Sequence, residues 1–448
     1  MKRFICHTLG IDRAISAATA TELIRFVTGP ITMLLIIRYL SPETQGYYYS
    51  FGAVMGIQVF LEAGFAVSIA QFAAREFANL RFTEKNILRG KAENLSRMRS
   101  IYQKARKYYV ATASVLTFGL GVGGYFFFSS QPDHGVPWQI PWIVASLCAG
   151  LNFLLTPFWA ILEGCNRVAD VAAYRFGVTI AGFLTGALGM VATQSIWVVI
   201  WSSIATTATA YIYIFWKWSG LLYQIRRPYR SGYQVNWRKE IWGFQWRIAG
   251  TWGGRYFLEA GIPAIAFQFF GAVPAGKIGM SFQLTRIVAS IASSWTATKI
   301  PYWGALISRN ERSALAESWL KSSRLHLAIA FVGQASLLAI VATAAILTPV
   351  KAERILPPTI FAGFSIGWFF YSFWLAAMHY TRAHRLEPFV YAHMIIAVSF
   401  LGLTMLNMNT LGVAALSYSF ALVHVPVAFW SWRVMHGIQI ANETSVAT

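Results

Sequence analysis

Charged residues are scarce in this sequence. They make up 12% of its 448 residues, about half the share that a soluble protein carries. Acidic residues are scarcer still, with 17 Asp and Glu against 37 Lys and Arg. The three cysteines, Cys6, Cys148 and Cys165, have a spacing that fits neither a zinc site nor a disulfide framework. No polar stretch is long enough for a folded soluble domain, which needs roughly 50 residues. These features exclude a soluble globular enzyme and a single-anchor protein with an appended domain.

Long apolar runs occupy most of the chain instead. Hydrophobic residues make up 56% of the sequence, and each run has about the twenty residues that cross the hydrocarbon core as a helix. The runs predict an all-α, polytopic membrane protein with twelve transmembrane helices. They lie near residues 14–38, 46–72, 108–128, 141–164, 168–191, 196–216, 244–269, 278–300, 325–349, 359–380, 388–408 and 411–432.

The distribution of basic residues predicts the orientation in the membrane. With the N-terminus inside, the inside segments hold about 27 Lys and Arg and the outside segments about four. We therefore expect both termini in the cytoplasm, with residues 1–13 as a lead-in to the first span rather than a cleaved signal peptide. The net charge of +20 then indicates orientation and contact with anionic membrane lipids, not nucleic-acid binding.

The spans divide into two sets of six around a basic stretch. We predict an N-terminal six-helix bundle over residues 1–216, a cytoplasmic linker over 217–243 and a C-terminal six-helix bundle over 244–448. Transporters are often built from such halves with the substrate site between them, which predicts a central cavity. The long basic loop 76–107 also contains apolar residues, and we interpret it as a helix lying on the inner leaflet. The alternative is a solvated basic linker.

The first pair of spans resembles a known family. Residues 38–51 read RYLSPETQGYYYSF and residues 60–76 read FLEAGFAVSIAQFAARE. The Pro, the acidic residue and the Gly-Tyr pair in the first turn, followed by an acidic residue beside Gly in the second span, are similar to polysaccharide-type transporters. These belong to the multidrug/oligosaccharidyl-lipid/polysaccharide exporter superfamily. The resemblance implies a flippase that moves an undecaprenyl-diphosphate-linked oligosaccharide, such as an O-antigen unit, across the bacterial cytoplasmic (inner) membrane.

Such a substrate needs cations at membrane depth, because each unpaired polar group costs several kcal/mol in hydrocarbon. Arg25, Arg255 and Arg286 lie well inside predicted spans, and a guanidinium can bind phosphate bidentately. Glu22 and Glu259 share a helix face with Arg25 and Arg255, so each of these arginines either contacts the diphosphate or is neutralised by its neighbour. Arg286 has no acidic neighbour within a turn or two of helix.

Other basic residues have a simpler interpretation. Arg175, Arg247 and Lys299 lie within two turns of predicted cytoplasmic ends, where long basic side chains reach the interface. The cytoplasmic turn after the tenth span holds His379, His384 and His393 together with Arg382 and Arg385. We predict that Arg382, His384 and Arg385 form a basic rim that meets lipid head groups or the diphosphate.

Carboxylates inside the spans suggest ion coupling. A carboxylate in low dielectric can titrate near neutrality, which suits a proton or sodium site. Glu62 is the strongest candidate because no basic residue lies close to it in sequence, and Glu22 and Glu259 are further candidates. The alternative for Glu62 is a carboxylate satisfied by neighbouring hydroxyl groups or a distant Arg.

Three functions remain open. The first is the lipid-linked oligosaccharide flippase, with alternating access around fixed cations and, as further partners, glycan assembly proteins such as a polymerase or a chain-length regulator. The second is a drug or cation antiporter of the same superfamily. The third is a membrane-embedded glycan polymerase or glycosyltransferase, for which the sequence lacks an Asp-x-Asp pair or paired catalytic acids. We expect no enzymatic activity, no metal and no cofactor.

Overall fold

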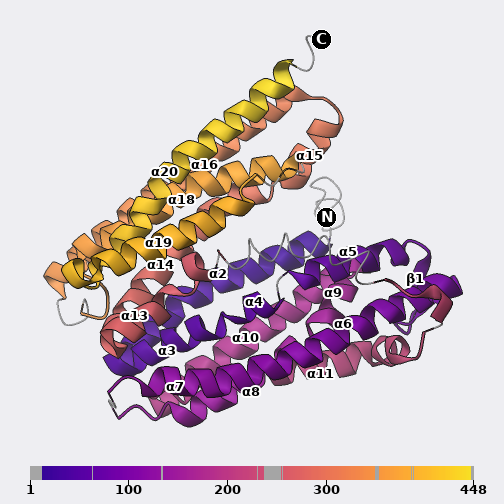
Figure 1. Ribbon diagram of the computed structural model, residues 1–448, viewed down its shortest axis with the longest axis horizontal. Helices are drawn as coiled ribbons and strands as arrows, with labels where there is room; N and C mark the ends of the chain where they lie inside the picture. The colour runs from indigo at the N-terminus through magenta and orange to yellow at the C-terminus, as the bar shows by residue number, and fades with distance from the viewer. Residues whose placement is uncertain are drawn as a thin grey trace, which may run out of the picture. The chain divides into compact units, whose positions relative to one another are not determined.

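The computed structural model describes residues 13–62, 64–132, 135–229, 231–236, 254, 256–348, 353–384, 386 and 388–444. These residues are almost all helical, apart from one two-stranded antiparallel hairpin. The chain divides into two units, Met1–Trp252 (unit 1) and Gly253–Thr448 (unit 2). Each unit is a bundle of long helices, and Figure 1 shows α10 and α11 running alongside each other in unit 1.

Unit 1 holds the hairpin and most of the shorter helices. A π-helical turn, η1, interrupts the third span, and a 3₁₀ turn, η2, follows the last helix. The elements of unit 1 are α2 (Arg13–Tyr39), α3 (Pro42–Met55), α4 (Gln58–Glu62), α5 (Phe65–Phe77), β1 (Leu80–Phe82), β2 (Leu88–Gly90), α6 (Ala92–Phe118), η1 (Gly119–Gly123), α7 (Gly124–Ser129), α8 (Gln139–Phe153), α9 (Thr156–Gly164), α10 (Val168–Thr193), α11 (Val198–Arg226) and η2 (Ser231–Tyr233).

Unit 2 consists of helices. Its elements are α13 (Ile262–Phe270), α14 (Ala272–Ala297), α15 (Ile300–Ser308), α16 (Arg312–Leu347), α18 (Pro358–Ala383), α19 (Val390–Leu411) and α20 (Ala414–Thr444). Helices α18 and α20 pack closely because Gly363 and Gly367, one turn apart on α18, bring the two backbones together. A Cβ at Gly363 would lie 2.3 Å from the Ser417 hydroxyl oxygen, and one at Gly367 would lie 2.3 Å from the Phe420 ring.

The membrane spans follow the predicted runs closely. Among the described residues, eight helices are long and apolar enough to cross a membrane, or nine if the bent helices α3, α4 and α5 form one span. The predicted runs at 14–38 and 278–300 correspond to α2 and α14, and the described part of the run at 244–269, residues 254 and 256–269, includes most of α13.

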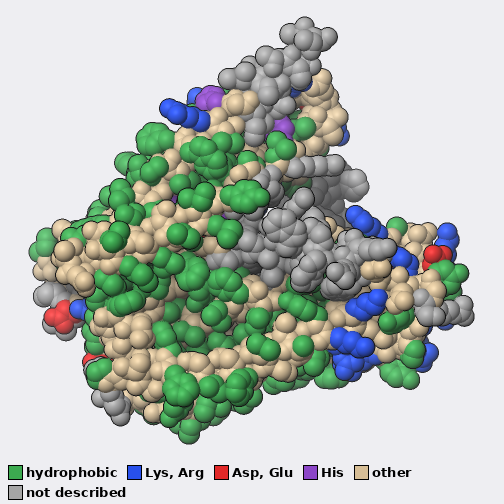
Figure 2. Space-filling model, viewed as in Figure 1, with side chains coloured by type: hydrophobic (Ala, Val, Ile, Leu, Met, Phe, Trp, Pro, Cys, Tyr) green, Lys and Arg blue, Asp and Glu red, His purple; other side chains and the backbone are tan. Residues whose placement is uncertain are grey.

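Large apolar side chains face outward along these helices. Leu34, Phe118, Trp216, Ile346 and Leu406 are each about two-thirds exposed or more, as expected for side chains that contact lipid. Figure 2 shows hydrophobic side chains spread over the visible face, whereas Lys and Arg gather at the end of unit 1 that carries β1. This pattern identifies a multi-pass membrane protein.

The second span is broken, although its sequence predicts one continuous helix. Ser41 caps α3 by accepting a hydrogen bond from the Thr44 amide at 3.1 Å, and Pro42 begins the helix. The run at 46–72 then bends by 44° between α4 and α5. Gly64 lies at the break with φ +71°, a left-handed conformation that glycine adopts without strain.

The prediction of a helix on the inner leaflet within residues 76–107 is wrong. This segment forms the β1–β2 hairpin and the first turns of α6, which begins 16 residues before the predicted third span at 108. Its apolar residues Leu88, Met98 and Ile101 are buried inside unit 1. They pack against protein because the hairpin and the start of α6 cover one end of the bundle.

The predicted linker over 217–243 also begins as a helix, since α11 continues to Arg226. The chain beyond α11 is fastened to α6. Gln103 donates to the Arg227 carbonyl and Lys104 to the Val235 carbonyl, each at 2.5 Å, and the Val235 amide donates to Ser100 at 3.2 Å. Val235 is buried by these contacts.

Candidate functional site

The structure describes only part of the predicted binding set. Arg255 and Arg385 lie outside the described residues. Arg25 and Glu22 lie on α2, in a stretch whose side chains are not described. The predicted residues with described side chains are Glu62, Glu259, Arg286, Arg382 and His384.

Glu62 lies at the break in the second span and is half-buried. Its Oε1 accepts a hydrogen bond from the Ala66 amide at 3.2 Å, in the first turn of α5. Tyr108 of α6 donates to the neighbouring Leu61 carbonyl at 2.7 Å. The carboxylate thus satisfies an amide that the helix break would leave without an acceptor.

Arg286 and Glu259 come together inside unit 2. Arg286 Nη1, on α14, donates to the Glu259 backbone carbonyl at 3.2 Å. The Glu259 Oε1 accepts a hydrogen bond from the Tyr371 hydroxyl of α18 at 2.6 Å. The sequence had paired Glu259 with Arg255 along one helix and had not predicted Tyr371. Both charged side chains are half-buried, so the cluster combines a cation, a carboxylate and a phenol inside unit 2.

Aromatic rings and histidines surround this cluster. The Tyr371 ring lies 5.3 Å from the ring of His424 and 5.3 Å from that of Trp374. His424 Nδ1 contacts the Phe420 carbonyl at 2.7 Å, and its Nε2 is buried without a hydrogen-bond partner in the described part of unit 2. The cluster is therefore a polar patch within a tightly packed aromatic wall.

The two described members of the predicted cytoplasmic rim are half-buried. Arg382 lies in the last turn of α18 and His384 directly after it, whereas the neighbouring His379 and His393 are buried. Burial lowers the pKa of His384 below its ordinary value, which disfavours the protonated ring. His379 instead contacts Thr296 of α14 at 2.8 Å, and the same hydroxyl contacts His326 of α16 at 3.0 Å. These histidines join three helices and add no exposed positive charge.

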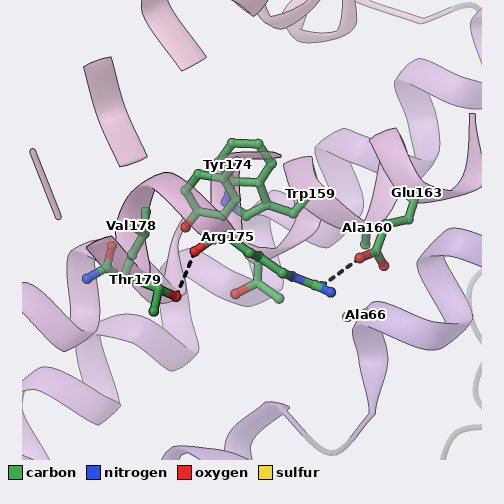
Figure 3. A pocket seen from close by; sticks show the side chains of 10 residues that line it. Ala66, Trp159, Ala160, Glu163, Tyr174, Arg175, Val178 and Thr179 are labelled. Atoms are coloured by element: carbon green, nitrogen blue, oxygen red, sulfur yellow. Dashed lines mark hydrogen bonds and ion pairs between the residues drawn. The ribbon is translucent and has the colours of Figure 1, made fainter. Parts of the chain in front are cut away.

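Unit 1 contains a pocket of about 330 Å³ (Figure 3). Its walls come from α5, α8, α9 and α10. The Trp159 and Tyr174 rings are stacked with centroids 3.7 Å apart and planes 13° apart. Arg175 Nη2 donates to Glu163 Oε1 at 2.6 Å, and both residues line the pocket. We call this cavity the α9–α10 pocket.

Local packing explains why these side chains converge. Gly164 lies so close to α5 that a Cβ there would be 2.3 Å from the Ala70 carbonyl oxygen. The chain then reverses at Asn166, which has φ +57°, before α10 begins. This short turn places the end of α9 beside the first turns of α10, so Glu163 and Arg175 meet across it.

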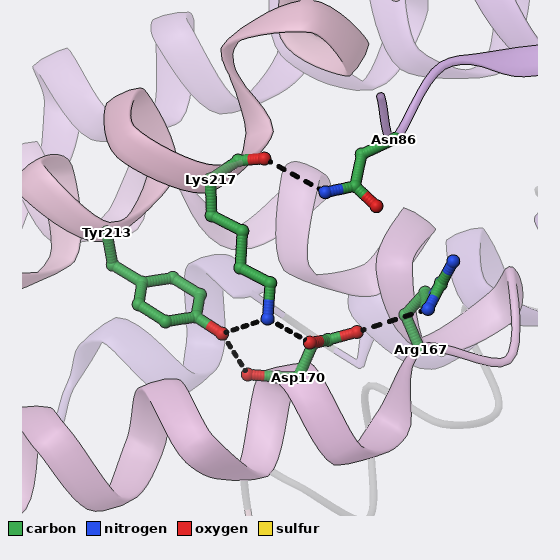
Figure 4. A network of polar contacts seen from close by, with 5 residues as sticks. All are labelled: Asn86, Arg167, Asp170, Tyr213 and Lys217. Carbon is green, nitrogen blue, oxygen red and sulfur yellow. Dashed lines mark hydrogen bonds and ion pairs between the residues drawn. The ribbon is translucent and has the colours of Figure 1, made fainter. Parts of the chain in front are cut away.

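A polar network that includes Tyr213 (Figure 4) lies beside the aromatic rings of the pocket. Lys217 forms an ion pair with Asp170, and the Tyr213 hydroxyl donates to the Asp170 carbonyl at 3.1 Å. Arg167 lies 3.8 Å from the second Asp170 oxygen. The Tyr213 ring packs 6.0 Å from that of Tyr174, so the network holds the aromatic wall in place.

This pocket was not predicted from the sequence. Arg175 was expected instead to reach the membrane interface. The available signal was the pair of opposite charges, Glu163 and Arg175, on either side of a short turn between two spans. In the described part of the chain, no three His, Cys, Asp or Glu side chains are grouped as a metal site requires.

Several solved membrane transporters are similar to this chain. An inward-facing multidrug resistance MATE family transporter of the MOP superfamily has a TM-score of 0.68 and 13% identity, covering 96% of this chain and 95% of that chain. The MATE multidrug transporter DinF-BH has a TM-score of 0.60 and 13% identity, covering 95% of each chain. The lipid II flippase MurJ, in an inward closed conformation, has a TM-score of 0.68 and 11% identity, covering 94% of this chain and 87% of that chain.

These similarities show the fold. They confirm the predicted fold class, an all-α polytopic membrane protein of two helical bundles. No protein-family model matches the sequence, and comparison with curated proteins gives no match.

Proposed function

We propose that this chain is a transporter of the multidrug/oligosaccharidyl-lipid/polysaccharide exporter superfamily that flips a lipid-linked oligosaccharide across the bacterial cytoplasmic membrane. The lipid carrier is undecaprenyl diphosphate, and movement is from the inner to the outer leaflet. The fold shared with MATE transporters and with a lipid II flippase supports a transporter rather than an enzyme. The resemblance of the first two spans to polysaccharide-type transporters supports the glycan substrate.

The observation that carries the proposal is Arg286. It lies within α14, half-buried, several turns from either end of the helix. Its hydrogen bond to the Glu259 carbonyl orients the guanidinium, which has five N–H donors in a fixed fork. A cation held at membrane depth costs at least about 3 kcal/mol on insertion scales, which functional sites commonly tolerate. A diphosphate is the anion that such a guanidinium fits best.

The direction of transport agrees with electrostatics. An anion that leaves the negative side of the membrane gains about 2.3 kcal/mol per charge per 100 mV. The gain is kept only if the cation stays in place while access alternates, as in repeat-built transporters. We place both termini in the cytoplasm, so that the basic end of unit 1 meets anionic lipids of the inner leaflet.

Ion coupling is proposed for the Glu259–Tyr371 pair. The Glu259 carboxylate is half-buried and accepts a 2.6 Å hydrogen bond from the Tyr371 phenol. A carboxylate offers about four acceptor sites, so one that is bound by a phenol can also take a proton or a sodium ion. Glu62, which caps α5, is the weaker candidate because its role in the helix break explains its position.

A second candidate function is a drug or cation antiporter. The Glu259 carboxylate beside aromatic rings favours it, since cations bind to such surroundings. The MATE multidrug transporters with the same fold also favour it. The two functions differ in the ligand that stabilises the purified protein: glycan-diphosphate lipid supports the flippase, and a lipophilic cation supports the antiporter.

The test is delivery of glycan to the outer face in cells that depend on this chain. We expect Arg286→Ala to lower delivery roughly ten- to hundredfold, the effect of losing a hydrogen bond to a charged group. Arg324→Ala, at an exposed position on α16, is the matched control and should deliver normally. Full delivery by Arg286→Ala, with normal amounts of inserted protein, would remove Arg286 from the mechanism.

A further inference from the structure

We propose that the α9–α10 pocket binds one uncharged sugar ring of the transported glycan. This inference rests on the proposed function and names the part of the substrate that unit 1 recognises. At about 330 Å³ the pocket is at the small end of the 300–1,000 Å³ range for ligand sites, so it suits a single ring rather than a whole oligosaccharide.

The pocket has an aromatic platform. Trp159 and Tyr174 are stacked at 3.7 Å, and Tyr213 packs against both rings at 6.2 and 6.0 Å. Trp159 is only 8% exposed and supports the half-buried Tyr174 ring, which provides the flat apolar surface open to a ligand. A sugar ring presents C–H groups on one face and can lie against such a surface.

The polar side of the pocket is a charged pair with spare hydrogen-bonding capacity. Glu163 and Arg175 side chains are 30% and 54% exposed, so the pair is open to a ligand. Their mutual contact uses Oε1 and Nη2. A carboxylate offers about four acceptor sites and a guanidinium five donors, which leaves most of both sets for hydroxyl groups. Alternating donors and acceptors are what a polyol requires.

Charge balance selects an uncharged ligand. Glu163 and Arg175 cancel each other at 2.6 Å, so the pocket attracts neither a diphosphate nor a lipophilic cation by net charge. An acyl chain is also disfavoured, since filling the pocket with hydrocarbon would desolvate the pair. A neutral sugar satisfies both the rings and the charged groups.

The site is preorganised by groups that do not line it. Tyr213 donates to the Asp170 carbonyl, and Lys217 contacts both Tyr213 and the Asp170 carboxylate (Figure 4). Asn86 of the hairpin donates to the Lys217 carbonyl at 3.2 Å. These contacts hold Tyr213, which packs against the aromatic platform, and so reduce the ordering that binding would require.

The experiment measures binding of methyl glycosides to the purified full-length protein by saturation-transfer NMR. The probes are methyl hexosides and methyl N-acetylhexosaminides. We expect at least one to bind saturably to the wild type, and Glu163→Gln to weaken that binding at least about tenfold, because it removes a charged acceptor. Glu93→Gln, at an exposed carboxylate in the first turn of α6, is the control and should bind as the wild type does.

A second variant tests the cavity itself. Val178 lines the pocket, and Val178→Phe fills the space without altering the charged pair. We expect this variant to lose glycoside binding while its thermal unfolding stays near that of the wild type. Retained binding by Val178→Phe, or displacement of the glycoside by a lipophilic cation, would overturn the assignment.

Flipping of glycan-diphosphate lipid in vesicles separates the two proposals. Glycoside binding with no flipping by the wild type would refute the proposed function and leave the sugar site standing. Flipping by the wild type with no binding of any glycoside would refute the sugar site and leave the function standing. Reduced flipping by Glu163→Gln would support both.

Discussion

Gln224 holds the β-hairpin on the end of α11 through both atoms of its amide, and we predict that Gln224→Ala releases it. Nε2 donates to the Leu88 carbonyl at 2.7 Å, and Oε1 accepts from the Leu88 amide at 2.8 Å. Leu88 lies on β2 and is 1% exposed. Removing the side chain leaves the Leu88 amide and carbonyl without these hydrogen-bond partners. They belong to a strand of only three residues, so the loss affects much of its backbone.

The expected change in the free energy of hairpin opening follows from the number of hydrogen bonds lost. A neutral hydrogen bond contributes about 0.5–1.5 kcal/mol net, and a buried group left unsatisfied costs about 1–3 kcal/mol. Two bonds at a partly exposed edge therefore give about 2–3 kcal/mol for local opening of the hairpin. At about 1.4 kcal/mol per factor of ten, the hairpin amides should exchange roughly 30- to 140-fold faster.

The assay is hydrogen–deuterium exchange of peptides that cover the hairpin, with the protein in lipid nanodiscs. Gln224→Glu is the matched control, because it keeps an acceptor for the Leu88 amide and loses the donor to the carbonyl. We expect its exchange rate to lie between those of the wild type and Gln224→Ala. Identical exchange in all three proteins would refute the claim that this amide holds the hairpin.

Three further predictions concern the stability of the two units. Gly363→Ala should lower the free energy of unfolding by about 1–3 kcal/mol, because its Cβ would lie 2.3 Å from a side-chain oxygen of α20. Gly402→Ala is the control and should not destabilise, because no atom lies within 4 Å of its Cβ; thermal melting in detergent compares the two variants. Lys217→Met should lower the free energy of unfolding by about 1–2 kcal/mol, because it removes the countercharge closest to the Asp170 carboxylate. Adding Asp170→Asn should restore most of that loss. A double variant that is no more stable than Lys217→Met would contradict the pairing. Burial lowers the pKa of His384 from its ordinary value of 6.5, so as the pH falls the unfolded chain binds a proton at this histidine before the folded chain does. The stability is therefore full above pH 6.5 and falls as the pH drops below it. In His384→Gln the melting temperature should depend less on pH over this range.

The spans were predictable from the sequence, but the helix ends were not. Apolar runs report where a chain crosses hydrocarbon, and a helix can continue past that limit on polar residues. α6 begins at Ala92 and α16 at Arg312, each more than ten residues before the predicted run. In α6 these early turns are held by contacts to the end of α11, which no local pattern reveals.

The hairpin was missed for a related reason. Its strands have three residues each, too few for an alternating pattern to stand out. Its turn depends on Asn86 at φ +54°. The Leu88 amide on its outer edge donates a hydrogen bond to Gln224, which is 136 residues away in the chain. The local sequence is basic and mildly apolar, which is equally typical of a helix on a membrane surface.

The candidate sites were predictable only in part. Residue type and depth identified Arg286 and Glu259 as unusual, because charge inside an apolar run is costly. Their contact, and the bond from Tyr371, depend on the packing of helices that are far apart in the sequence. Trp159 and Tyr174 are common aromatic residues in a chain that is 16% aromatic, so their stacking became visible only in the structure.

The fastening of Val235 to α6 turns the chain that follows α11 into a closed loop on the surface of unit 1. Gln103 holds the Arg227 carbonyl and Lys104, the next residue of α6, holds the Val235 carbonyl, so both ends of the loop are anchored on the same helix. A residue inserted between Arg227 and Val235 therefore only enlarges this loop and leaves the two anchor points, and the helices that carry them, in place.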